Sequence, residues 1–408
     1  MDKLLEAYSK KEILFNYSGK DLRFKVSQSL FSSYDVDIGT KRLLRTFILE
    51  GIHKYKKVLD LGCGYGPIGI ALKSANKSSH VHMVDLDALA LAFSRINSEL
   101  NNAGDIKIYG SLGYDDINDR DFDLIVSNIP AKVGKEVLSI LLTDGKYHLV
   151  PKGRMAIVIV DAIYDYVITT LSSSKVNILY HKSWPGHHVF HYEFPENDIQ
   201  ISLKKSAWEE GKYIRELVNI AYPRLLNYSI QTTYNLPGFD NPSFDTKLLL
   251  TNLSIIGHNK IGRALFFNPG QGYLPVALSK LKKISEIKLV DRNLQSLRSS
   301  VNNLVRNGYT PENISVSHQV GMEQVDKKAY GVIIGNIDKK EDVKVLKIFI
   351  EQVASLIEND GVVLFASGST TITRMVNIVH KIKRLRILKR DRAKGRSLLA
   401  IKAISPPG

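Results

Sequence analysis

The sequence has one cysteine, Cys63, among 408 residues. It therefore cannot form a disulfide within the chain, and it lacks the thiolates that a structural zinc site needs. It also has no apolar run near the roughly 18 residues of a membrane-spanning helix, and residues 1–14 mix charged with apolar side chains instead of forming a signal-peptide pattern. These absences predict a protein of a reducing compartment, which we expect to be the cytoplasm, with no membrane partner.

Basic residues, by contrast, are in excess. The 56 lysines and arginines outnumber the 41 aspartates and glutamates by 15, which favours a polyanionic partner. The excess is concentrated in residues 381–396, where nine basic residues accompany one acidic residue, Asp391, for a charge of +8. A solvated hairpin face would also explain this cluster, but its alternation with apolar residues favours contact with phosphates.

The two halves of the chain repeat one another, which indicates a tandem duplication. Matched segments follow in the same order at an offset of 206 to 208: 58–72 with 264–278, Asp85 with Asp291, and 122–138 with 330–346. We expect the boundary near residues 195–199, which gives domains 1–196 and 197–408.

Each half alternates short β-branched runs with helical patterns, which predicts βαβ units. The expected fold class is α/β, with two tandem Rossmann-like domains, each a mostly parallel sheet closed by an antiparallel hairpin. The expected strands are 57–61, 80–85, 106–109, 124–127 and 155–160, with closing hairpins 176–181/189–194 and 385–389/397–403. Ser206 and Glu209 form a capping-box pattern that predicts a helix ending before Pro223.

The candidate chemistry lies in the first half. A glycine loop, residues 62–66, directly follows a strand, so a ligand can approach its backbone closely. Asp85 ends the next strand, where a carboxylate can accept hydrogen bonds from both hydroxyls of a ribose. The G-x-G-x-G spacing after Asp60 differs from the G-x-G-x-x-G of pyrophosphate sites, which favours an adenosine-type cofactor without a pyrophosphate. We interpret Cys63 as a small space-filling residue of this loop, not a nucleophile.

These motifs resemble those of the class I S-adenosylmethionine-dependent methyltransferases, and in particular the small-domain group that contains ribosomal RNA guanine-N2 methyltransferases. The resemblance rests on Phe31-Ser32, Asp37-x-Gly39-Thr40, residues 58–66, Asp85 with Ala90 and Asn97, and Ser127-Asn128-Ile129-Pro130. It covers about residues 20 to 195, and the second half more weakly.

The resemblance implies S-adenosyl-L-methionine as cofactor and assigns roles by position. It implies that Asp60, Gly62, Gly64 and Gly66 line the methionine and sulfonium end, that Asp85 holds the ribose, that Ser111 and Leu112 lie near the adenine, and that Asn128 and Pro130 form the catalytic loop. The Asn128 carboxamide and the Ile129 carbonyl would accept hydrogen bonds from a target NH2 group and so aim its nitrogen at the methyl carbon.

Two departures bear on the substrate and on metals. The family loop is usually Asn-Pro-Pro-aromatic, whereas Ala131 stands in the aromatic position here, so stacking on a base would have to come from Phe31, Tyr114 or Trp184. Four histidines surround the Trp184-Pro185-Gly186 turn: His181, His187, His188 and His191. Because a two-stranded hairpin points them to alternating faces, we predict no metal site.

The second half has lost several of these residues. At equivalent positions Asp60 is replaced by Phe266, Gly62 by Asn268, Gly69 by Pro275 and Pro130 by Asp338. We expect a degenerate domain kept for substrate binding. The resemblance implies one active and one inactive copy in the ribosomal enzymes, with the active copy C-terminal, so the order is reversed here.

The sequence therefore predicts an RNA methyltransferase acting on an exocyclic base amine such as guanine N2 of ribosomal RNA. We expect RNA contacts from the basic hairpin residues Arg384, Arg386, Lys389, Arg390 and Arg392, and a monomer, because the duplication supplies an internal pair. Two alternatives stay open: methylation of a protein amide or small molecule, and a non-catalytic RNA-binding assembly factor.

Overall fold

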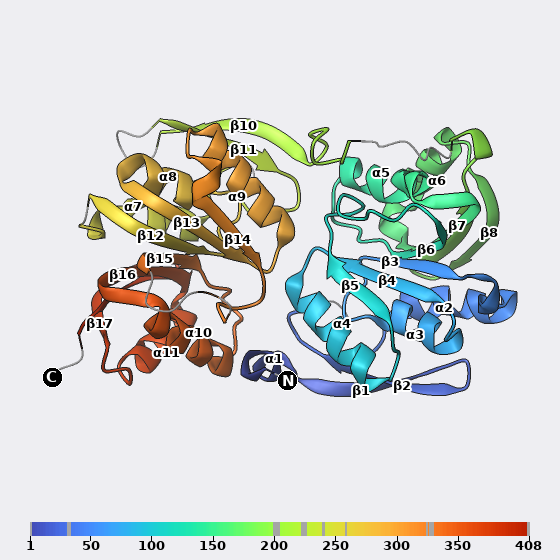
Figure 1. The fold of residues 1–408 in the computed structure, drawn as a ribbon, viewed down its shortest axis with the longest axis horizontal. Coiled ribbons are helices and arrows are strands. Elements are labelled where there is room, and N and C mark those ends of the chain that lie inside the picture. The colour runs from blue at the N-terminus through green and yellow to red at the C-terminus, as the bar shows by residue number, and fades with distance from the viewer. Residues whose placement is uncertain are drawn as a thin grey trace. The chain divides into compact units, whose positions relative to one another are not determined.

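The computed structural model describes residues 2–30, 34–198, 205–221, 227–238, 241–257, 259–323, 325 and 330–405. The chain forms two compact units (Figure 1). Unit 1 contains Tyr8–Tyr213, and unit 2 contains Asp2–Ala7 together with Ile214–Gly408. Among the described residues, no helix has the length and apolar character to cross a membrane.

Unit 1 is built on a seven-stranded sheet of order β5-β4-β3-β6-β7-β9-β8. Its strands are β3 (Lys57–Leu61), β4 (His80–Asp85), β5 (Ile106–Gly110), β6 (Phe122–Asn128), β7 (Leu149–Val160), β8 (Asn177–Trp184) and β9 (His187–Glu193). Strands β3 to β7 run parallel, while β9 pairs antiparallel with β7 and β8 antiparallel with β9. The predicted parallel sheet with a closing hairpin is confirmed.

Helices connect the strands of unit 1. They are α2 (Ile38–Glu50), α3 (Pro67–Ala75), α4 (Ala88–Leu100), α5 (Lys135–Thr143) and α6 (Tyr164–Ser173). The first helix of the chain, α1 (Lys3–Tyr8), belongs to unit 2 except for Tyr8. Local sequence sets their starts: Pro67 occupies the first turn of α3, where its missing N–H has no partner to lose, and the Asp87 side chain caps α4 by accepting from Leu89 N–H. Strand order reverses at β3, and ligands of open α/β sheets bind at such a switch point.

Unit 2 repeats this plan with the order β14-β13-β12-β15-β16-β18-β17. Its strands are β12 (Lys260–Phe267), β13 (Lys283–Asp291), β14 (Ile314–His318), β15 (Tyr330–Asn336), β16 (Ile357–Gly368), β17 (Leu385–Ala393) and β18 (Arg396–Ala403); its helices are α7 (Phe244–Thr251), α8 (Tyr273–Leu281), α9 (Leu294–Arg306), α10 (Val343–Leu356) and α11 (Ser369–Val379). Short 3-10 turns lie in unit 1 at Ile52–Lys54, Asp144–Tyr147, Asp161–Ile163 and Glu196–Asp198, and in unit 2 at Leu253–Ile255 and Pro311–Asn313. The equal strand order confirms the duplication.

A two-stranded ribbon in each unit was not predicted. In unit 1 it is β1 (Lys11–Tyr17) with β2 (Lys20–Val26), and in unit 2 it is β10 (Ile214–Ile220) with β11 (Tyr228–Thr233). An asparagine at equivalent positions of the two units links each ribbon to the loop after the first parallel strand. Asn97 donates to the carbonyls of Lys25 and Tyr65, and Asn303 donates to those of Gln231 and Gln271.

The helix predicted after Ser206 is wrong. The capping box itself forms, with Ser206 N–H donating to Glu209 Oε2 (3.0 Å) and Glu209 N–H to Ser206 Oγ (3.2 Å). The chain then leaves this single turn and enters β10, because pairing with β11 outweighs the helical pattern.

The segment before β10 packs on unit 1. Asp115 accepts hydrogen bonds from the N–H groups of Ala207 and Trp208, and Tyr213 OH donates to Leu112 O. These contacts place the segment up to Tyr213 in the compact unit 1.

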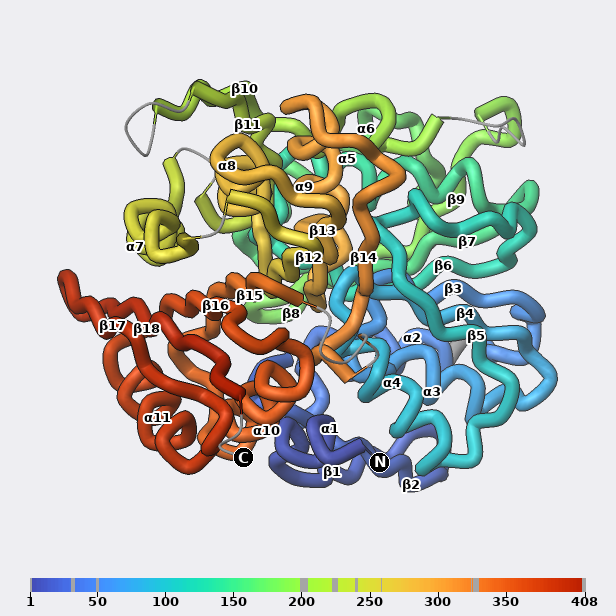
Figure 2. Tube along the Cα trace, turned by 60° about the vertical axis from the view of Figure 1, so that its left-hand side comes forward, coloured from blue at the N-terminus to red at the C-terminus, as the bar shows by residue number. Residues whose placement is uncertain are grey.

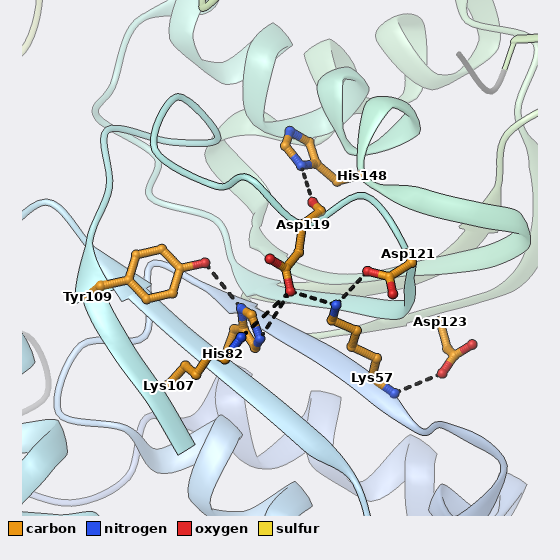
Figure 3. A network of polar contacts seen from close by, with 8 residues as sticks. All are labelled: Lys57, His82, Lys107, Tyr109, Asp119, Asp121, Asp123 and His148. Atoms are coloured by element: carbon orange, nitrogen blue, oxygen red, sulfur yellow. Dashed lines mark hydrogen bonds and ion pairs between the residues drawn. The ribbon is translucent and has the colours of Figure 1, made fainter. Parts of the chain in front are cut away.

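A polar network lies at the amino-terminal ends of β3 and β4 (Figure 3). Lys57 Nζ pairs with Asp119 (2.6 Å) and Asp121 (2.5 Å). His82 lies 3.5 Å from Asp119, but burial lowers the pKa of His82 to about 4, so the imidazole is neutral near pH 7. This network fixes the loop before β6, at the opposite end of β3 from the glycine loop.

Candidate functional site

The glycine loop leaves the carboxyl end of β3 and turns back over β4. The N–H groups of Gly62 and Cys63 both donate to Val84 O at 2.9 Å. Gly62, Gly64 and Gly66 have φ values of +74°, +58° and +91°, a region that other residues rarely adopt. A Cβ on Gly62 or Gly64 would meet no atom within 4 Å, whereas one on Gly66 would lie 2.9 Å from the Ile70 side chain. The first two glycines therefore border open space, and the third is favoured by its positive φ and by its close packing against Ile70.

Asp60 lies beneath this loop. Its side chain is fully buried, its Oδ2 accepts the Gly69 N–H at 2.8 Å, and its Oδ1 has no hydrogen-bond partner among the described residues. Burial raises the pKa of Asp60 to about 7, and the negative charge of Asp85 contributes. A buried acceptor without a partner is costly in a folded chain, and it suits a site where a ligand supplies the donor.

Asp85 ends β4 and is held in one orientation by the backbone. Its Oδ2 accepts from Gly64 N–H and its Oδ1 from Asp87 N–H, both at 2.9 Å. Burial raises the pKa of Asp85 to about 6, and the nearby Asp87 charge adds to the rise. Each carboxylate oxygen keeps a second lone pair, so the two oxygens can still accept from vicinal hydroxyl groups.

Ser111 and Leu112 follow β5 and are both 2% exposed. Ser111 N–H donates to Asp85 O (3.0 Å), which places this turn beside the end of β4. Ser111 Oγ donates to Gly113 O (2.7 Å), and Leu112 N–H donates to Asp116 Oδ2 (3.0 Å). Their polar groups are thus engaged within the turn, and they can contribute shape to a binding site more readily than hydrogen bonds.

Asn128 ends β6, and two residues at the start of α2 fix its side-chain amide. Its Nδ2 donates to Asp37 Oδ2 (2.9 Å) and to Thr40 Oγ1 (3.0 Å). Asp37 also caps α2 by accepting the Thr40 N–H at 3.1 Å. Because both amide hydrogens are engaged, Oδ1 is left as an acceptor, and no described residue donates to it. After it, Ile129 is buried and Pro130 is exposed.

Gly39 allows this arrangement. A Cβ at Gly39 would lie 2.7 Å from His187 Cδ2 and 2.9 Å from Asp37 Oδ2, so any larger residue would displace the carboxylate that holds Asn128. Sequence reasoning found the Asp37-x-Gly39-Thr40 motif but gave its members no role. The signal was present, because an aspartate three residues before a threonine at a helix start is an N-cap pattern.

The structure distinguishes among the three aromatic residues that were candidates for stacking on a base. Tyr114 is 5% exposed and its hydroxyl donates to Leu141 O (3.1 Å), so it does not offer a stacking face. Phe31 and Ser32 lie outside the described residues, which leaves Trp184, half-buried at the end of β8.

Burial raises the pKa of the Cys63 thiol, which agrees with a packing role. Among the described residues, no group of three or more metal-ligating side chains converges.

Unit 2 lacks both partners of the hydrogen bond that joins Asp60 and Gly69 in unit 1. Phe266, 1% exposed, stands where unit 1 has Asp60, and Pro275 stands where Gly69 supplies the N–H, which proline lacks. The Asn268 side chain crosses the loop and donates to Asn336 O at 2.9 Å.

The remaining polar residues of unit 2 have changed partners. Asp291 accepts a short hydrogen bond from Ser296 Oγ in place of the loop N–H that Asp85 accepts. Ser243 replaces the capping aspartate and pairs with Thr246 (2.9 Å between hydroxyls). The Asn336 side-chain oxygen is buried with no partner among the described residues.

The basic hairpin β17–β18 lies at one edge of the unit 2 sheet (Figure 2). Arg384 donates to the carbonyls of Ala354 (2.8 Å) and Ile357 (2.5 Å) at the end of α10. Three further basic side chains are also engaged within the protein. Lys389 donates to Asn252 Oδ1 (2.8 Å), Arg390 donates to Thr373 Oγ1, and Arg396 pairs with Asp245 (2.6 Å). Arg386 and Arg392 are exposed and contact no acceptor among the described residues.

A doubly wound sheet of this strand order, with a glycine loop at its switch point and a carboxylate on the next strand, defines a methyltransferase-type nucleoside-cofactor fold. The chain belongs to the methyltransferase small domain family, which matches it twice, over residues 21–173 and 231–391. This confirms the family and the S-adenosylmethionine-dependent class expected from the motifs.

Relatives with curated names match part of the chain. Protein YbxB of Bacillus subtilis, which is uncharacterized, is 34% identical over 146 residues, or 36% of this chain and 72% of YbxB. Ribosomal RNA small subunit methyltransferase C of Pasteurella multocida is 36% identical over 144 residues, or 34% of this chain and 42% of that protein. The match thus spans less than half the length of the named methyltransferase.

One solved structure shares the fold over the whole chain. It is the 16S rRNA N2 methyltransferase RsmC of T. thermophilus, solved with AdoMet and guanosine. It has 15% identity and a TM-score of 0.67, and the superposition covers 98% of this chain and 99% of that one. The tandem arrangement of two Rossmann-like domains is therefore shared between the two proteins.

Proposed function

We propose that unit 1 transfers a methyl group from S-adenosylmethionine to an exocyclic amine of a base in RNA. The observation that carries this proposal is the fixed amide of Asn128, whose NH2 group is engaged by Asp37 and Thr40 while its Oδ1 remains an acceptor. An NH2 group on the substrate needs such an acceptor, and a fixed orientation converts binding into positioning.

The residues of the loop after β6 would position the amine. Asn128 Oδ1 accepts one hydrogen of the target NH2 and the Ile129 carbonyl accepts the other, which directs the nitrogen lone pair out of the base plane. S-adenosylmethionine, when bound, would supply an electrophilic methyl group on a sulfonium: the N–C bond would form as the S–C bond breaks, the sulfur would leave as the neutral thioether of S-adenosylhomocysteine, and the methylated amine would lose one proton to solvent. Because the amine becomes more positive as it is alkylated, both acceptors bind it more tightly in the transition state than in the ground state.

The residues around the glycine loop fit the cofactor. Gly62 and Gly64 border open space where a Cβ would intrude, and Asp85 presents two oriented carboxylate oxygens to a ribose. The unpartnered Oδ1 of Asp60 suits an ammonium or backbone donor near the methionine end. The cofactor site would also be lined by Gly66, Ser111 and Leu112, which would contribute shape and no hydrogen bonds from their side chains.

RNA, and guanine N2 in particular, is proposed as the substrate by likeness. RsmC of T. thermophilus, which shares the fold, is named a 16S rRNA N2 methyltransferase and was solved with guanosine, and the relative from Pasteurella multocida is named a ribosomal RNA small subunit methyltransferase. The net charge of +15 supports a polyanionic partner. Unit 2 would hold the RNA, with Arg386 and Arg392 as its best-placed cations, and the internal duplication suits a monomer.

The test is mass spectrometric mapping of modified nucleosides in RNA from cells lacking the gene, complemented by the parent chain or by Asn128→Ala. The proposal predicts one methylated nucleoside that disappears, returns with the parent chain and does not return with the variant. An unchanged set of RNA modifications would contradict RNA as the substrate and favour a protein or small-molecule acceptor. Rescue by both chains would favour a non-catalytic RNA-binding role.

A further inference from the structure

The turn between β8 and β9 carries an aromatic ring with two cations beside it. The Arg42 guanidinium lies 5.5 Å and the Lys182 ammonium 5.0 Å from the centre of the Trp184 ring. Arg42 also donates to Pro185 O and contacts His187 Nδ1, both at 3.0 Å. Arg42 therefore fixes the turn to α2, while Lys182, which is exposed, is held by the ring alone among the described residues.

This pair of cations gives the turn a local positive charge. No described carboxylate forms an ion pair with Arg42 or Lys182, although two like charges beside one ring repel each other. The equivalent edge of unit 2 differs, because Arg396 there pairs with Asp245 at 2.6 Å, and Asp245 occupies the position of Gly39. The unit 1 turn thus offers two cations beside an aromatic face, with no carboxylate partner for either among the described residues.

The turn lies on the same side of the sheet as the Asn128 amide. Thr40, which holds that amide, is two residues before Arg42 on α2. The register runs from Asn128 to Val158 across β6 and β7, from Val160 to His187 across β7 and β9, and from His187 to Trp184 across β9 and β8. Three strand spacings, about 14 Å, and a two-residue step along β7 separate Trp184 from Asn128, which is too far for one base to touch both.

We infer that Trp184, Arg42 and Lys182 bind the nucleotide that flanks the target in single-stranded RNA. The base stacks on the indole, displacing the exposed Lys182 ammonium, and the two cations bind the adjoining phosphates. Aromatic faces beside cations are the features with which proteins bind single strands. This inference rests on the proposed function, since it assumes that Asn128 receives the target base.

Fluorescence provides the test, because the chain has two tryptophans. In a Trp208→Phe background, Trp184 is the single indole, and the probe is a 12-nucleotide single-stranded RNA of mixed sequence. Inorganic polyphosphate serves as a control that has charge but no bases. We expect RNA to quench Trp184 and polyphosphate to bind with little quenching, since only bases stack.

Substitutions separate the binding role from a structural one. In the otherwise native chain, Trp184→Ala should weaken RNA binding about 10-fold, Trp184→Phe should restore most of it, and S-adenosylmethionine affinity and the melting temperature should not change. In methyl transfer, Trp184→Ala should raise KM more than it lowers kcat.

The outcomes distinguish the two proposals. Unchanged RNA affinity in Trp184→Ala, or equal quenching by polyphosphate, would overturn the stacking role while leaving methyl transfer by the parent chain intact. Absence of methyl transfer by the parent chain, with RNA quenching preserved, would instead overturn the proposed function and retain Trp184 as an RNA contact.

Discussion

Asp37 holds Asn128 across 91 residues of sequence, with 2.9 Å between Asp37 Oδ2 and Asn128 Nδ2. The same carboxylate caps α2. One side chain thereby starts a helix and fixes the orientation of the amide at the end of β6, so the geometry of the candidate site depends on a residue that need not touch the substrate.

The first prediction concerns this positioning residue. Asp37→Ser keeps an N-cap, as Ser243 does in unit 2, but its shorter side chain no longer reaches Asn128. We expect kcat to fall about 10- to 100-fold with S-adenosylmethionine affinity unchanged, measured by steady-state methyl transfer and calorimetry. Asp35→Asn, which removes an exposed pair with Lys41, is the matched control and should leave both values as they are. Equal loss in the two variants would exclude a specific role for Asp37.

The second prediction concerns where the cofactor binds. Asp85→Ala removes the two ribose acceptors and should weaken S-adenosylmethionine binding by about 1 to 3 kcal/mol, or roughly 5- to 150-fold. Asp291→Ala makes the same change at the matched position of unit 2, where Ser296 already engages the carboxylate, and should not alter the affinity. Calorimetry on the two full-length variants decides; similar losses in both would place cofactor in each unit.

The third prediction follows from the pKa of Asp85, which burial raises to about 6. The carboxylate is ionised above this pH and accepts ribose hydrogen bonds best in that form. S-adenosylmethionine affinity should therefore be constant at high pH and fall as the pH drops through 6, by up to tenfold per pH unit. Asp85→Asn should flatten this profile, and any slope left near pH 7 would report Asp60, whose pKa is also raised. A parent profile that stays flat from pH 8 to 5 would show that Asp85 does not bind in its ionised form.

The fourth prediction separates RNA-contacting from structural cations. Replacing Arg386 and Arg392 together by glutamine should weaken RNA binding and reduce the slope of log affinity against log salt by about 1.4, or roughly 0.7 for each phosphate contact. Arg384→Gln should lower the melting temperature instead, because it removes hydrogen bonds to carbonyls at the end of α10, and should leave the slope unchanged. Superimposable salt series for the double variant and the parent would mean that the hairpin does not bind RNA.

Strand positions were predictable because central parallel strands are rich in buried apolar residues, as in β6, where Leu124, Ile125 and Val126 are all buried. The glycine loop and Asp85 were predictable because each directly follows such a run. The Ser206 turn was not, since a capping box is a local signal, and pairing across β10 and β11 is decided by residues distant in sequence.

The interaction partners of charged side chains also could not be predicted from the sequence. Arg384 reads as one more member of a basic cluster, yet its side chain bonds two backbone carbonyls. The contact between Asp37 and Asn128 joins α2 to the fourth strand along the main sheet, and no local pattern indicates it. Sequence could supply the candidate residues, whereas which amide hydrogen or carboxylate oxygen is already engaged required the packed structure.

The most direct test of unit 1 as the catalytic unit is single-turnover methyl transfer by Asn128→Ala and by Asn336→Ala, its counterpart at the end of β15. Asn128→Ala should bind S-adenosylmethionine as the parent does and transfer the methyl group at least about 100-fold more slowly, because the acceptor for the target amine is gone. Asn336→Ala should react at the parent rate. Parent-like transfer by Asn128→Ala, or an equal loss in both variants, would contradict the account.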